Sequence, residues 1–85
     1  MKPTFMKADQ ARMQANDAFI KINNLKLLET QNEITRVVKY GIFKIEVDFE
    51  RSETLNYVSN FLRAEGYKTH FYYADNKVPM LSISW

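Results

Sequence analysis

The sequence contains no cysteine, and this absence excludes several kinds of site. The chain cannot form a disulfide and has no thiol nucleophile. Its single histidine, His70, is too few for a structural zinc site, which needs about four cysteine or histidine ligands. Glu46 and Asp48 could together hold a hard cation, but a solvated strand face is the simpler interpretation. We therefore expect neither a metal centre nor a cofactor.

Glycine and proline are also scarce, with two of each in 85 residues. This leaves little room for flexible linkers or for a glycine-rich loop that cradles phosphate. The chain lacks the run of about 18 apolar residues that a membrane-spanning helix needs. Residues 1–10 lack the apolar core of a secretion signal. We therefore expect no membrane association, and a protein of the cytoplasm.

A strong charge of one sign is missing too, because twelve basic side chains face ten acidic ones and the net charge is only +2. Nucleic-acid-binding proteins usually carry a larger or more clustered basic excess, so we do not expect nucleic acid as a partner.

A chain of this length forms one domain, residues 1–85, and buries only about 60–65% of its unfolded surface. Without disulfides or a metal, association with copies of itself is the remaining route to more buried area.

Residues 8–40 contain neither glycine nor proline and predict a long helix that Gly41 ends. One apolar stripe recurs at steps of four and three residues, through Ala11, Ala15, Ala18, Ile22 and Leu25. A second stripe, out of phase with the first, runs through Leu27, Ile34, Val37 and Val38. Two interpretations remain open. Either one helix shifts its buried face, which we favour, or two helices meet near residues 30–32, where Thr30 and Glu33 would form a capping box.

A helix of this length is about 45 Å long, whereas a domain of this size has a radius of gyration of about 12 Å. Part of the helix must therefore project beyond the rest of the chain. The first stripe, together with Ala8, is rich in alanine and allows another helix to approach closely. It packs either on the chain's own sheet or on the same helix of another copy, and we favour the second.

Residues 41–85 predict a β-α-β-β arrangement. Phe43, Ile45, Val47 and Phe49 alternate with charged residues, as in a strand with one face in the core. Ser52 offers an N-cap for a helix over residues 53–65, which Gly66 ends. The apolar residues that follow helical spacing in this segment are Leu55, Val58, Phe61 and Leu62.

Residues 67–74 and 80–85 predict an antiparallel hairpin around the turn residues 74–77. Leu81, Ile83 and Trp85 share one face of the last strand, so the chain ends on a core residue. We expect an α+β fold with a small three-stranded sheet. Because a helix connects the first strand to the hairpin, the first strand is expected to lie parallel to one hairpin strand.

Charged and aromatic side chains supply a candidate ligand site, although each group has a simpler interpretation. The candidate ligand-binding residues are Arg36, Lys39, Tyr40, Lys44, His70 and Tyr72. Cations and aromatic rings of this kind suit an anionic, nucleotide-type ligand. However, cations at a helix C-terminus are expected from the helix dipole alone, and a polar strand face is often merely solvated. One histidine among several serines is a weak basis for catalysis, so we expect no enzyme.

Several short motifs together resemble a group of small proteins encoded by tailed bacteriophages. These motifs are Asp9-Gln10-Ala11-Arg12, Ile34, Val38, Gly41, Glu65-Gly66-Tyr67 and the terminal Leu81-Ser82-Ile83-Ser84-Trp85. Many members end in a "GY…LxISW" hairpin. The resemblance implies the cytoplasm of an infected bacterium. Small phage proteins of this size include anti-defence proteins that hold nucleotide immune signals in oligomer pockets, inhibitors of host proteins, and minor virion components.

Three functional hypotheses follow. The first is a non-enzymatic, homo-oligomeric counter-defence protein that sequesters a small nucleotide-type signal. The second is an inhibitor that binds a host protein through the first helix or through the acidic run at residues 46–53. The third is a minor virion or assembly component. The mixture of basic and aromatic residues favours the first.

Overall fold

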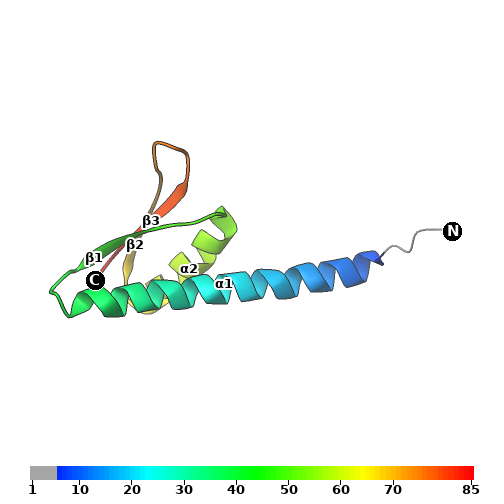
Figure 1. Cartoon of the computed structure of the whole chain (residues 1–85), viewed down its shortest axis with the longest axis horizontal. Coiled ribbons are helices and arrows are strands. Elements are labelled where there is room, and N and C mark those ends of the chain that lie inside the picture. The colour runs from blue at the N-terminus through cyan, green and yellow to red at the C-terminus, as the bar shows by residue number, and fades with distance from the viewer. Residues whose placement is uncertain (1–5) are drawn as a thin grey trace.

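The computed structural model describes residues 6–85 and orders them as helix, strand, helix, strand, strand (Figure 1). The elements are α1 (Ala8–Val38), β1 (Lys44–Asp48), α2 (Ser52–Ala64), β2 (Lys68–Tyr73) and β3 (Pro79–Ser84). This order confirms the predicted α+β fold. Residues 1–5, part of the segment without a predicted secretion signal, lie outside the described residues. In residues 6–85, no helix is both long enough and apolar enough to span a membrane.

The N-terminal segment forms one continuous helix, which confirms the first of the two interpretations. Thr30 does not cap a second helix, because its buried hydroxyl donates a hydrogen bond to the carbonyl oxygen of Lys26 at 2.8 Å. The helix ends at Val38, and Gly41 follows with a φ of +73° that other residues rarely adopt. The sequence therefore located the end of α1 to within a few residues.

The sheet places β3 in the centre, between β1 and β2. Both pairs are antiparallel, with Ile83 opposite Ile45 on one side and opposite Thr69 on the other. The predicted hairpin of β2 and β3 is confirmed. The first strand runs in the same direction as β2, as a helical crossover favours, but it does not pair with β2. It pairs antiparallel with β3 instead, so the sheet contains no parallel ladder.

Both helices cover the same face of the sheet, where the core lies (Figure 1). The buried apolar residues are Ile34, Val37, Ile45, Phe49, Leu55, Val58, Leu62, Leu81 and Ile83. Several predicted core residues lie outside this set: Leu27 and Val47 are half-buried, and Val38 is exposed. Phe43 is 69% exposed because β1 begins only after it, and Phe61 is exposed because it lies on the outer flank of α2. Trp85 is half-buried and meets the ring of Tyr67 edge-on at 6.0 Å, so it closes the margin of the core.

The second helix differs slightly from its predicted start. The N-cap is Arg51, and Ser52 is already helical, so the predicted serine cap is wrong. The helix ends as predicted, since Gly66 has a φ of +94° and its amide donates to the carbonyl oxygen of Arg63 at 3.0 Å.

The molecule is elongated because α1 extends beyond the sheet and α2 (Figure 1). Its extents are 63 × 27 × 20 Å, and its radius of gyration is 16.7 Å. The second value exceeds the roughly 12 Å of a compact domain of this length. The N-terminal half of α1 is therefore the projecting part that the sequence predicts.

Candidate functional site

One stripe of α1 faces the body of the protein and does so along only part of the helix. The body-facing residues are Asn23, Thr30, Ile34 and Val37, which are buried, and Phe19 and Leu27, which are half-buried. They follow steps of three and four residues, as one face of a helix does. Sequence reasoning placed Leu27, Ile34 and Val37 in this stripe, but not Phe19. It missed Asn23 and Thr30 because polar residues give no signal in a search for apolar periodicity.

The first apolar stripe lies on a different face of α1 and is exposed. We call the residues Ala8, Ala11, Ala15, Ala18, Ile22 and Leu25 the seam. Successive residues of a helix are turned by about 100°, so Ile22 faces well away from its buried neighbour Asn23. Ile22 is 41% exposed and Leu25 is 66% exposed. The interpretation that this stripe packs on the chain's own sheet is therefore wrong.

A second and sparser apolar row lies on the other flank of the projecting helix. It consists of Met13 and Ile20, both exposed. They are seven residues apart, and the polar residues Asn16 and Asp17 lie between them. The seam is longer and is not interrupted by polar residues, so it is the stronger candidate for a buried contact.

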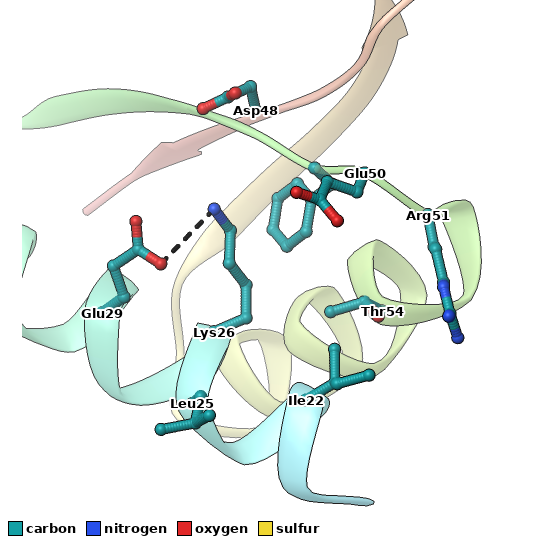
Figure 2. A pocket seen from close by; sticks show the side chains of 9 residues that line it. Ile22, Leu25, Lys26, Glu29, Asp48, Glu50, Arg51 and Thr54 are labelled. Carbon is teal, nitrogen blue, oxygen red and sulfur yellow. Dashed lines mark ion pairs between the residues drawn. The ribbon is translucent and has the colours of Figure 1, made fainter. Parts of the chain in front are cut away.

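A hollow of about 310 Å³ lies where the end of the seam meets the connection between β1 and α2. Its lining residues are Ile22, Leu25, Lys26, Glu29, Asp48, Phe49, Glu50, Arg51 and Thr54. Figure 2 shows Lys26 reaching from α1 toward the loop residues and pairing with Glu29. Its ammonium lies 3.6 Å from the Glu29 carboxylate and 5.1 Å from the centre of the Phe49 ring. These contacts hold Lys26 against its own chain.

Two buried polar atoms have no hydrogen-bond partner within residues 6–85, and one of them belongs to Thr54, which lines this hollow. They are the side-chain carbonyl oxygen of Asn23 and the hydroxyl of Thr54. Asn23 is 1% exposed and Thr54 is 4% exposed. The neighbouring Asn24 does have a partner, since its oxygen accepts a hydrogen bond from the Tyr57 hydroxyl at 3.2 Å. An unpaired buried polar group costs about 1–3 kcal/mol, so each of these two atoms lowers the stability of the fold.

Three of the predicted ligand residues lie at or near the C-terminal end of α1, namely Arg36, Lys39 and Tyr40. The guanidinium of Arg36 already has a partner, because it donates two hydrogen bonds to the Glu33 carboxylate, at 2.5 and 3.2 Å. These hydrogen bonds lower the pKa of Glu33. A phosphate would have to displace this fork-like pair before it could bind Arg36.

The other three predicted residues share the sheet face that the helices leave uncovered, which we call the open face. Lys44 of β1 points there because its neighbour Ile45 is buried, and His70 and Tyr72 of β2 alternate with the inward residues of their strand. The rings of His70 and Tyr72 stack at 6.2 Å. Lys68 lies on the open face as well, although sequence reasoning did not select it. Lys44 and Lys68 form one row across the sheet, with Ser84 between them.

Glu46 and Tyr72 also influence each other across the open face. The pKa of Tyr72 is raised, chiefly because its hydroxyl is shielded from water and to a lesser degree because of the negative charge of the Glu46 carboxylate. Glu46, Ser82 and His70 lie in one row across the sheet, with the serine in the middle. A catalytic triad needs the histidine between the serine and the carboxylate, so this row does not form one. Residues 6–85 also contain no group of three or more side chains that could ligate a metal.

The predicted site therefore divides between two parts of the structure, the end of α1 and the open face. The hollow beside the seam is lined by other residues, as are two further hollows in residues 6–85, one next to Gln31 and Phe61 and one next to Glu33 and Glu46. Comparisons with known protein families, with curated proteins and with solved structures find no match to this chain. The resemblance to small phage proteins stays a prediction, and functional inference rests on the geometry.

Proposed function

We propose that this protein is a non-enzymatic binding protein that works as a homo-oligomer assembled through the projecting half of α1. The observation that supports this proposal is the seam, an apolar stripe that stays exposed along a helix projecting from its domain. Burying such a stripe is the usual reason for an amphipathic helix to form. A second copy of the same helix supplies the cover that the chain itself does not.

The exposure of the N-terminal part of α1 supports the same proposal. Residues 8–18 of α1 are all exposed, so this part of the helix gains almost nothing from its own sheet. An isolated helix of this length is marginal in water, whereas pairing would stabilise it. The alanines let two helix axes approach to about 8 Å, the short end of the usual range.

The test compares two isoleucines of the projecting helix that have similar exposure but point in different directions. Ile22 lies in the seam, whereas Ile20 lies in the sparser row and is 48% exposed. Ile22→Glu places a charge in the proposed interface and should raise the dissociation constant of the oligomer by at least about tenfold, or about 1.4 kcal/mol. Ile20→Glu should leave it unchanged. The dissociation constants are measured by analytical ultracentrifugation.

The opposite pattern would contradict the proposal. If Ile20→Glu dissociates the oligomer and Ile22→Glu does not, the sparser row is the interface. Circular dichroism of both variants controls for folding. Because both residues lie on the exposed side of α1, neither change should unfold the domain.

We propose the open face as the ligand-binding surface of this oligomer, with a small nucleotide-type anion as ligand. Supporting observations are the row of Lys44 and Lys68 and the adjacent stacked pair of His70 and Tyr72. Cations beside aromatic rings suit a phosphorylated aromatic ligand. A counter-defence role in the cytoplasm of an infected bacterium belongs to this same proposal and is supported by the resemblance alone.

A further inference from the structure

The geometry of the seam points to an antiparallel dimer in which Ala15 of one copy lies opposite Ala18 of the other. This inference rests on the proposed self-association and adds the orientation and register of the two helices. The opposed pairs are then Ala15 with Ala18, Ala11 with Ile22, and Ala8 with Leu25. A two-fold axis passes between residues 16 and 17, so each pair occurs twice, once on either side of the axis, as in other symmetric dimers.

The sizes of the seam residues favour this orientation. Large residues occur only at its C-terminal end, at Ile22 and Leu25, and small ones occupy the rest. In the antiparallel register each large side chain meets an alanine, so the helices can stay close along the whole seam. A parallel pair would place leucine on leucine and isoleucine on isoleucine at one end and alanine on alanine at the other. The two helices would then have to diverge or leave a gap.

The charges beside the seam favour the same orientation. In a parallel pair, a residue that precedes Ala8, Ala15 or Ile22 lies next to the residue five positions later in the other copy. This places Lys7 next to Arg12 and Lys21 next to Lys26. Each of these like-charged contacts would occur twice. Unfavourable charge pairs of this kind oppose the wrong arrangement of an interface.

The antiparallel register avoids these repulsive contacts. Gln14 then lies next to Lys21, and Arg12 lies next to Phe19, whose ring is half-buried. The first contact is between a neutral and a charged residue, and the second brings a guanidinium to an aromatic ring, which is an attractive combination.

The same register also gives the hollow beside the seam an occupant. Ile22 and Leu25 line the hollow, and Figure 2 shows the carboxylates of Asp48 and Glu50 on the loop side. The first helical turn of the second copy would lie against these two apolar residues, since Ala8 and Ala11 oppose them.

Disulfide cross-linking tests this inference directly, because the chain has no cysteine of its own. In the double variant Ala11→Cys/Ile22→Cys, the two cysteines of one chain are about 16 Å apart along the helix and cannot join each other. In the antiparallel dimer they face the cysteines of the second copy, so mild oxidation should give a covalent dimer. Ala11→Cys alone should not cross-link, since the two copies of residue 11 are also about 16 Å apart along the axis.

A matched control places its two cysteines symmetrically about the same two-fold axis, but on the other flank of the helix. Met13→Cys/Ile20→Cys should cross-link at least about tenfold less than the seam variant under the same oxidation. Efficient cross-linking of Ala11→Cys alone would show a parallel dimer and overturn the inference. A non-covalent dimer in which the seam variant fails to cross-link would also overturn it. If the unmodified protein is monomeric, the proposed self-association itself fails, and the two failures are therefore distinguishable.

Discussion

Two threonines offer a sharp test of how the body of the protein is held together. Thr69 of β2 is part of a hydrogen-bonded cluster, in which its hydroxyl lies 2.8 Å from the hydroxyl of the buried Ser59 and accepts a bond from Arg63 at 2.7 Å. Thr54 of α2 is buried, and its hydroxyl has no partner within residues 6–85. Replacing either one by valine changes a hydroxyl to a methyl group at almost constant shape.

The expected effects have opposite signs. Thr69→Val leaves the buried Ser59 without its partner, which costs about 1–3 kcal/mol. Thr54→Val removes an unpaired buried hydroxyl and adds an apolar group, so stability should stay the same or rise by about 1 kcal/mol. Threonine and valine are both β-branched, so differences in backbone preference largely cancel.

Thermal unfolding followed by circular dichroism measures both effects at one protein concentration. For a domain of this size, 1 kcal/mol corresponds to about 4–8 °C in Tm. We expect Thr69→Val to lower the Tm and Thr54→Val to leave it unchanged or raise it. Equal losses in both variants would refute the reasoning, because the hydroxyl of Thr54 would then have a partner that matters.

Two further predictions concern the open face. The pKa of Tyr72, followed by NMR of its ring, should lie above the ordinary tyrosine value. Glu46→Gln should lower this pKa only in part, since shielding from water is the larger cause of the shift. Because the folded state holds the Tyr72 proton more tightly than the unfolded state does, the stability that this proton contributes is lost as the pH rises through the Tyr72 pKa. The double variant Lys44→Ala/Lys68→Ala should weaken the binding of ATP, used as a probe, by at least about tenfold in calorimetric titration at low salt. The same change at Lys21 and Lys77, two exposed lysines that the ligand proposal does not use, serves as the charge-matched control. The absence of ATP binding by the unmodified protein would contradict the ligand proposal.

Much of the fold was predictable because local signals agreed with one another. The glycine-free and proline-free run predicted one long helix, and Gly41 and Gly66 marked the ends of both helices. Alternation around Ile45 and Ile83 predicted two strands and their inward faces. The pairing of β1 with β3 was not predictable, because local periodicity carries no information on which strands become neighbours.

The candidate site was less predictable, for two physical reasons. Polar residues such as Asn23 and Thr30 can occupy a buried helix face, and no apolar period reveals them. Residues of suitable chemistry can also lie on different parts of the structure, as Arg36 and His70 do. The seam was found from sequence because its signal, an uninterrupted period of four and three residues, is itself the property that makes it a candidate interface.

The most direct test of the proposed self-association is the native mass of the unmodified 85-residue chain across a range of concentrations. Native mass spectrometry and light scattering should give an oligomer, with twice the 10.1 kDa chain mass for the dimer proposed here. Ile22→Glu should shift this species to the single-chain mass at concentrations where Ile20→Glu leaves it intact. A protein that remains at 10.1 kDa at the highest concentrations would contradict the account, because the seam would then be exposed without a second copy to cover it.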